Sequence, residues 1–308
     1  MNMESHLSIR KCPTCGLDGT KEISSKIAAE DISSDELQKY WSGFFKERIF
    51  FTYHRCPGCG LLFDGKYLTS SYLNGMYASM SDNTAGQPLQ LMQKTQGGYF
   101  KILTKHGEIQ GNYVEIGPDI GLFTALAAAT GKVNRFSLWE PNKVVHDQLR
   151  KSTKNITCTI YDDLSSINSL PENSVDVVVM IHVLDHLLEP VSFLKILRSK
   201  MKKNGKLCIV THNEKSLLSR ILGRKWPAFC LQHPQLFNPN SIRSMLKSAG
   251  FSTEGVYKTI NYFPILYLFK HAMWACGVKI PLPNWKSPIL PLKLGNIETI
   301  GQVLEDHS

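Results

Sequence analysis

From Asn112 onward, the apolar positions of the chain alternate between two periodicities. Short runs of β-branched and aromatic residues predict strands at 113–116, 135–139, 156–161, 175–181 and 205–211. Apolar residues spaced three or four positions apart predict helices at 122–129, 142–151, 190–201 and 241–249. The run VDVVVMI at 175–181 is apolar almost throughout, as expected of a strand buried on both faces. This alternation predicts an α/β fold with a doubly wound, mostly parallel sheet.

The first 110 residues lack this alternation. Residues 1–65 contain a helical pattern at 34–45 and a strand-like run at 48–54, and we predict that they form a separate small module. Turn-rich pieces at 69–74 and 79–86 precede a helical pattern at 89–105. The predicted organisation is therefore a module at 1–65, a helical connector at 66–110 and the α/β domain at 111–308.

Two cysteine pairs in the module, CPTCG and CPGCG, have the spacing of metal-binding knuckles. Their four thiolates, Cys12, Cys15, Cys56 and Cys59, would complete one tetrahedral zinc site, and a closed site is structural rather than catalytic. A dithiol redox pair is the competing interpretation. His54 could be a ligand only if one cysteine were not.

The four other cysteines are isolated, which is typical of a reducing compartment, and we expect the protein to be cytoplasmic. The first ten residues contain no apolar core of a signal peptide. The apolar stretch 262–269 is too short to span a bilayer. It predicts either a core or lid helix or a contact with a membrane surface or a lipid-linked substrate.

The formal charge of the 308-residue chain is +9, which favours an anionic partner. Nucleic acid, a phosphorylated small molecule and an acidic membrane surface all meet this description. Basic residues concentrate in 195–225, although such runs are usually solvated faces. No arginine-rich tail and no RNA-binding pattern of interleaved glycines and aromatics is visible, so nucleic acid is the less favoured partner.

Three candidate binding positions follow successive predicted strands. The turn from Gly117 to Gly121 opens a helix, whose amides can meet a polar group. Glu140 follows the second strand and could accept both hydroxyls of a ribose. Asp162 and Asp163 follow the third and could receive an adenine amine. Ligands of such sheets bind at the carboxyl ends of the strands, so the three positions together predict a nucleoside site. A nicotinamide dehydrogenase would carry the fingerprint G-x-G-x-x-G. The glycines at 117 and 121 do not have this spacing, and the acidic Glu115 lies within the strand, so a dinucleotide site is less favoured.

The α/β region resembles the class I S-adenosylmethionine-dependent methyltransferases. The resemblance rests on VEIGPDIG (114–121), LWEPN (138–142), YDDL (161–164), VDVVVMIHVLDHLLEP (175–190) and KKNGKLCIVTHN (202–213). It implies a seven-stranded, Rossmann-like sheet whose final helix lies in 233–251 and whose last, antiparallel strand lies in 294–304. The cysteine module is similar to the zinc-ribbon-like modules of sugar C-methyltransferases and of enzymes from bacterial surface-polysaccharide pathways.

The resemblance also implies roles for individual residues. Gly117 and Gly121 would shape the loop around the methionine moiety of S-adenosylmethionine, and Glu115 would orient it. Glu140 would hold the ribose, Asp162 or Asp163 the adenine, and Ile181 and His182 would lie beside the cofactor. Asp119 departs from the pattern, because the family usually has glycine there. Aspartate tolerates left-handed backbone, but its carboxylate would repel that of the methionine unless it turns outward or binds the amino group.

The segment HVLDH, just past the fourth strand, carries the predicted catalytic residues His182, Asp185 and His186. If the segment is helical, the two histidines share one face. Three interpretations stay open: a brace for the helix start, a histidine general base oriented by Asp185, or a divalent-cation site. His212 and His233 are further candidates.

Two segments, about 214–240 and 257–290, combine apolar and basic residues and are predicted acceptor-side lids. The leading hypothesis is methyl transfer to a small molecule, such as a sugar, nucleotide-sugar or glycan intermediate. The basic residues of the two lid segments would suit a phosphorylated acceptor. The alternatives are an rRNA or tRNA methyltransferase, and a weak or non-catalytic binding protein with the same fold.

Overall fold

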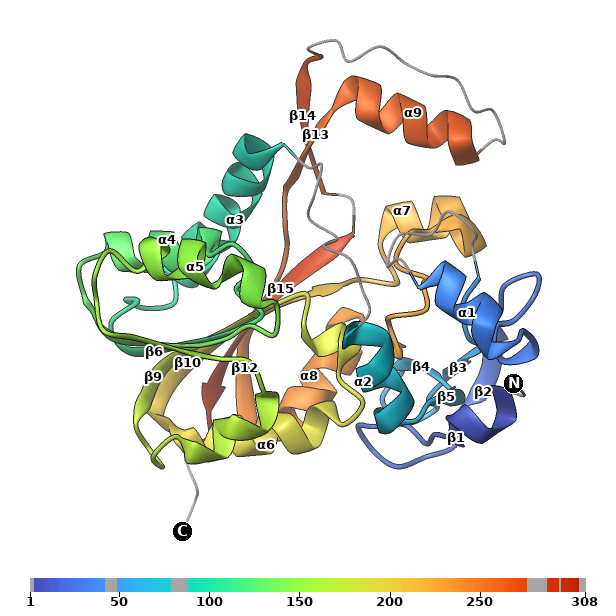
Figure 1. Cartoon of the computed structure of the whole chain (residues 1–308), viewed down its shortest axis with the longest axis horizontal. Helices are drawn as coiled ribbons and strands as arrows, with labels where there is room; N and C mark the ends of the chain where they lie inside the picture. Colours follow the sequence, from blue (N-terminus) through green and yellow to red (C-terminus); the bar gives the residue numbers. More distant parts are fainter. Residues whose placement is uncertain (1–2, 42–48, 79–87, 276–286, 294, 305–308) are drawn as a thin grey trace.

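A computed structural model describes residues 3–41, 49–78, 88–275, 287–293 and 295–304 (Figure 1). The predicted turn at 79–86 therefore lies outside the described residues. So do positions 42–45 of the helix predicted at 34–45 and positions 276–286 of the second lid segment.

The centre of the structure is a seven-stranded sheet with the order β12–β15–β10–β9–β6–β7–β8. Its strands are β6 (Gly111–Ile116), β7 (Val133–Trp139), β8 (Cys158–Tyr161), β9 (Val175–Ile181), β10 (Met201–His212), β12 (Phe251–Lys258) and β15 (Asn296–Val303). The strands from β10 to β8 are parallel, whereas β15 is antiparallel to both β10 and β12. The predicted α/β fold with a seven-stranded, mostly parallel sheet is confirmed.

Helices cover both faces of this sheet (Figure 1). One face carries α3 (Leu89–Leu103), α4 (Leu122–Ala129) and α5 (His146–Ser152), and the other carries α6 (Pro190–Lys200) and α8 (Pro239–Ser248). Two buried apolar clusters follow this division: Phe123 and Leu149 belong to one, and Phe193 and Ile242 to the other. Each such side chain contributes about 1.5–3 kcal/mol by leaving water, so the two layers hold the strand ends in fixed positions.

Short 3-10 helices connect several of these elements. They are η1 (Met3–His6), η2 (Ala29–Asp31), η3 (Lys143–Val145), η4 (Leu164–Ser169), η5 (Leu184–His186) and η6 (Gly223–Lys225). The predicted helix at 142–151 is split between η3 and α5, whereas α4 and β9 have the predicted bounds.

The N-terminal part forms two small sheets. In one, β1 (Leu7–Ile9) pairs with β5 (Lys66–Leu68). The other contains β2 (Thr20–Ile23), β3 (Tyr53–Arg55), β4 (Leu62–Asp64) and, from much later in the chain, β11 (Gln235–Leu236). Because β11 pairs with β4, the N-terminal part and the α/β part share a sheet.

Two local predictions in this part are wrong. The strand predicted at 48–54 is restricted to Tyr53–Arg55, because both backbone groups of Phe50 are hydrogen-bonded to the Ser25 hydroxyl instead of a neighbouring strand. The turn predicted at 69–74 lies in helix α2 (Ser70–Ala78), which buries Leu73 in an apolar cluster of the N-terminal part. Packing of this apolar face overrides the turn preference of the serines and Asn74. The N-terminal helix α1 is Ser34–Tyr40.

The last elements lie at the top of the view in Figure 1. Strands β13 (Asn261–Pro264) and β14 (Ile289–Leu292) pair, and α9 (Ile265–Ala275) follows β13. A shorter helix, α7 (Leu217–Leu222), follows β10. Among the described residues, no helix combines the length and apolar character needed to cross a bilayer.

Candidate functional site

The glycine turn after β6 adopts the backbone that its sequence requires. Gly117, Asp119 and Gly121 have φ values of 68°, 53° and 77°, all in the left-handed region. A Cβ atom on Gly117 would lie 2.7 Å from Cγ2 of Val183, so a larger residue would collide with the segment after β9. Asp119 is among the few residue types that adopt this conformation at low cost, so the turn survives the departure from glycine.

Glu140, at the end of β7, is buried and faces this turn. Its Oε2 atom accepts the backbone N–H of Asp119 at 2.9 Å, and its Oε1 atom accepts that of Asn142 at 2.9 Å. The carboxylate therefore fixes two loops at adjacent strand ends. A carboxylate oxygen accepts more than one hydrogen bond, so Glu140 can still receive a ligand hydroxyl.

The two aspartates after β8 take different positions. Asp162 lines the cavity described below and forms an ion pair with Lys143 at 2.6 Å. Asp163 caps η4 by accepting the backbone N–H of Ser165 at 2.9 Å. Of the two, only Asp162 is placed to contact a ligand in that cavity.

Glu115 points into the core rather than into the cavity. Its Oε2 atom accepts the hydroxyls of Tyr113 and Thr124, each at 2.7 Å. Burial raises the pKa of this carboxyl to about 7, and the two hydroxyls oppose that shift. Ile181 likewise packs against the apolar cluster beneath α4.

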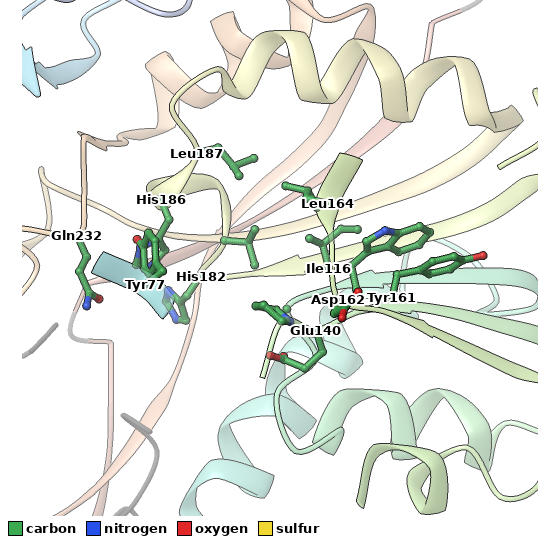
Figure 2. Close-up of a pocket in the computed structure, with 14 residues that line it drawn as sticks. Tyr77, Ile116, Glu140, Tyr161, Asp162, Leu164, His182, His186, Leu187 and Gln232 are labelled. Carbon is green, nitrogen blue, oxygen red and sulfur yellow. The ribbon is translucent and has the colours of Figure 1, made fainter. Parts of the chain in front are cut away.

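A cavity of about 400 Å³ lies over the carboxyl ends of β6, β7, β8 and β9 (Figure 2). Glu140, Tyr161 and Asp162 lie on one side of it, and His182, His186, Tyr77 and Gln232 on the other. The indole of Trp139 stacks on the Tyr161 ring with centroids 4.4 Å apart. The cavity thus joins the predicted nucleoside-binding carboxylates to the predicted catalytic histidines in one space.

The segment HVLDH is not an α-helix. His182 has a φ of 53° and is followed by the 3-10 turn η5, so His182 and His186 do not share a helical face. They are joined instead by two histidines from elsewhere, and four rings form a row. The centroid distances are 4.6 Å from His182 to His212, 4.8 Å from His212 to His233 and 4.7 Å from His233 to His186.

Asp185 is fully buried, and within the described part of the chain its side chain hydrogen-bonds to His212 and to neither His182 nor His186. Its Oδ2 atom accepts the backbone N–H of His212 at 3.2 Å and lies 2.8 Å from the ring Nδ1. Burial raises the pKa of Asp185 to about 6. This geometry holds His212 with Nδ1 toward the carboxylate and leaves Nε2 available.

Burial lowers the pKa of His182, His186 and His212. For His182 desolvation and the neighbouring His212 bring the pKa to about 3, and the pKa values of His186 and His212 also lie well below the ordinary value. The three rings are therefore neutral at pH 7 and can accept a proton or a hydrogen bond. His182, Asp185 and His212 also each place one potential ligand atom within 4.8 Å of the others.

Sequence reasoning missed three contributors to this site. Tyr77 comes from α2, and its hydroxyl lies 3.1 Å from Nδ1 of His186. Gln232 lines the cavity from the loop before β11. The pairing of His212 with Asp185 follows from the register of β10 beside β9, a relation that the order of strands in the sheet could have revealed.

The N-terminal part holds the loop that carries His233. The Tyr53 hydroxyl donates to the His233 carbonyl and the Tyr67 hydroxyl to the Leu231 carbonyl, each at 2.6 Å. The guanidinium of Arg10 donates to the Pro234 carbonyl at 2.9 Å. Three side chains thus donate hydrogen bonds to backbone carbonyls of one short loop, and these bonds fix the position of the loop and of the His233 ring on it.

The four module cysteines converge on one point. Their sulfur atoms are 3.5 Å apart for Cys12 and Cys59, 3.2 Å for Cys15 and Cys56, and 3.9 Å for Cys15 and Cys59. A zinc ion with bonds of about 2.3 Å requires tetrahedral edges of about 3.8 Å. Each pair ends in a left-handed glycine, Gly16 or Gly60, whose amide donates to the carbonyl of the first cysteine. The cluster therefore has the donor set and the spacing of a tetrahedral zinc site.

Residues 93–255 match the family described as Methyltransferase domain, which is more than half of the chain. The chain belongs to this methyltransferase family. It is an S-adenosylmethionine-dependent methyltransferase of class I, as the seven-stranded sheet and the sequence resemblance predict. No curated protein gives a significant match to the methyltransferase.

The comparison with solved structures finds matches at low sequence identity, of which the first has a TM-score above 0.5. One chain from the complex of the Haloferax volcanii Trm112 methyltransferase activator with a candidate methyltransferase is 14% identical, with a TM-score of 0.52. That match covers 72% of the present chain and 96% of the other. A methyltransferase from Aquifex aeolicus is 13% identical, with a TM-score of 0.47 and coverages of 71% and 99%. One from Mesorhizobium loti is 13% identical, with a TM-score of 0.45 and coverages of 67% and 97%.

Proposed function

We propose that S-adenosylmethionine occupies the cavity over β6 to β9, with its nucleoside beside Glu140 and Asp162. The Glu140 carboxylate would accept the ribose hydroxyls and Asp162 the adenine amine, while the turn containing Gly117, Asp119 and Gly121 would border the methionine moiety. The bound cofactor supplies an electrophilic methyl group. The observation that carries this proposal is that one cavity is lined by both of these carboxylates and by His182 and His186.

Glu115 and Ile181 are proposed to act from behind the cavity wall. Glu115 accepts the Thr124 hydroxyl at the start of α4 and so fixes the helix that follows the glycine turn. Asp163 would position Asp162 through its cap on η4. These residues would affect cofactor binding through the shape of the loop rather than by contact.

We infer that the acceptor enters on the side of His182 and His186 and loses its proton to a histidine of this row. The pairing of His212 with Asp185 supports His212 as the general base, with Asp185 as a positioning residue. His182 and His186, which line the cavity, would then orient the acceptor. Methyl transfer needs this alignment, because donor carbon and acceptor atom must approach in line.

The acceptor is proposed to be a sugar, nucleotide-sugar or glycan intermediate. The imidazoles of His182 and His186, the Gln232 amide and the Tyr77 hydroxyl line the cavity and offer several hydrogen bonds in a small space, which suits a molecule rich in hydroxyl groups. The cysteine module, for which we propose a structural zinc ion, supports the same assignment through the resemblance to sugar C-methyltransferases. We place this module at residues 1–65, with 66–110 as the connector.

Methyl transfer from labelled S-adenosylmethionine to an extract of nucleotide sugars, followed by mass spectrometry of the product, tests the acceptor class. We expect a labelled sugar nucleotide with the wild-type protein and none with Asp185→Asn. Label found only in RNA would contradict the proposal.

A further inference from the structure

The positive charge of the protein is concentrated in one part of the sequence. Residues 215–297 contain eleven lysines and arginines but a single carboxylate, Glu254. The segment therefore has a net charge of +10, and the remaining 24 basic and 25 acidic residues sum to −1, so this segment accounts for the net charge of +9. Glu254 itself forms ion pairs with Lys206 and His106, both outside the segment.

Helix α7 lies in this segment and is apolar on two faces. Leu218 and Leu222 pack against a buried cluster, which accounts for the inner face. Leu217 and Ile221, four residues apart, are 72% and 70% exposed and form an outer apolar face. Arg220 and Arg224 are also exposed, so basic groups flank the apolar pair.

Helix α9 also carries an exposed apolar pair. Ile265 and Phe269 are again four residues apart and are 39% and 50% exposed. The segment between β10 and α7 contacts the segment between β14 and β15, since the backbone N–H of Asn213 donates to the Gly295 carbonyl at 2.6 Å. Both helices lie toward the upper right in Figure 1.

We propose that α7 and α9 form a surface that binds an anionic lipid bilayer. Apolar side chains enter the headgroup region while lysines and arginines meet the lipid phosphates, which is the composition of interfacial helices. Exposed leucine and isoleucine distinguish this surface from one built for nucleic acid, where phosphates are met by polar and basic groups. Because α7 lies between His212 and His233 in the chain, the bilayer would face the acceptor side of the site.

Vesicle co-sedimentation of the full chain tests this inference without cofactor or acceptor. We expect binding to vesicles of phosphatidylcholine with phosphatidylglycerol and little binding to phosphatidylcholine alone. Leu217→Ser and Ile221→Ser should each lower the partition coefficient about tenfold, because each removes one membrane-buried aliphatic chain. Ile9→Ser is the matched control, since Ile9 is 81% exposed on β1, far from α7 in sequence and outside residues 215–297.

Arg220→Glu with Arg224→Glu should also abolish binding to the anionic vesicles. Equal binding of wild type and the Leu217 and Ile221 variants would overturn the inference. Binding to polyuridylate that is lost in the arginine variants and kept in Leu217→Ser and Ile221→Ser would assign the surface to RNA instead. All variants change exposed side chains outside the cavity. Methyl transfer to a water-soluble acceptor can therefore be measured separately from binding to the vesicles.

Discussion

The backbone N–H of Asp119 donates a hydrogen bond to the Glu140 carboxylate at 2.9 Å. This contact ties the glycine turn after β6 to the end of β7. It uses the backbone of Asp119, so the hydrogen bond does not depend on which side chain occupies the position. The aspartate side chain is therefore open to substitution without loss of this contact.

Replacing Asp119 should tighten cofactor binding. We expect Asp119→Gly to lower the dissociation constant of S-adenosylhomocysteine several-fold, because it removes a negative charge beside the proposed position of the methionine carboxylate. Asp119→Asn keeps the tolerance for left-handed backbone and removes only the charge. Equal gains in both variants would identify the charge as the cause, whereas weaker binding in both would show that the carboxylate contacts the cofactor.

The pairing of Asp185 with His212 predicts the pH dependence of methyl transfer. Burial raises the pKa of Asp185 to about 6, so the carboxylate is ionised and holds His212 only above that pH. The rate should rise through about pH 6 to a plateau, while the histidines, with lowered pKa values, stay neutral.

Asp185→Asn should lower the rate about 10²–10⁴-fold, the usual contribution of a positioned base, and should remove the limb near pH 6. The raised pKa means that the ionised carboxylate destabilises the fold as pH rises through 6. The variant should therefore melt no lower than wild type at pH 8, and its cofactor affinity should be unchanged. A full rate in Asp185→Asn would contradict the role of this pair.

The cysteine cluster predicts one zinc ion per chain. Elemental analysis should find this ion in wild type and in Cys158→Ala, a control at a cysteine outside the cluster, and should not find it in Cys15→Ala. A second metal ion that persists in Cys15→Ala and disappears in His212→Ala would show that His182, Asp185 and His212 form a metal site rather than a base.

The hydrogen bond from Tyr67 to the loop before β11 predicts an effect of this residue on acceptor binding. Tyr67→Phe removes the hydroxyl that donates to the Leu231 carbonyl and should cost about 1 kcal/mol in the free energy of unfolding. It should raise the KM of the acceptor and leave the affinity for S-adenosylhomocysteine unchanged. A change in cofactor affinity alone would contradict this role.

Local patterns in the sequence predict the elements whose apolar residues form a clear helical or strand-like run. The bounds of α4 and β9 follow from runs of apolar residues that need no knowledge of their partners. Helix α2 could not be predicted in this way, because its serines and Asn74 favour turns and only its packing against the N-terminal cluster makes it helical.

The site shows the same limit. Glu140 and Asp162 were predicted because each follows its own strand. The contact of Asp185 with His212 depends on β10 lying beside β9, and the position of His233 depends on Tyr53, which is 180 residues away. Such relations are set by tertiary contacts, which a single sequence does not display.

Calorimetric titration with S-adenosylhomocysteine tests the central claim most directly. We predict one binding site per wild-type chain, and affinity about ten- to a hundredfold lower in Glu140→Ala, since a hydrogen bond to a charged group contributes about 1.5–3 kcal/mol. Glu108→Ala, at an exposed carboxylate paired with Lys132, is the matched control and should bind as wild type does. Absence of binding in wild type, or equal affinity in Glu140→Ala, would contradict the proposed cofactor site.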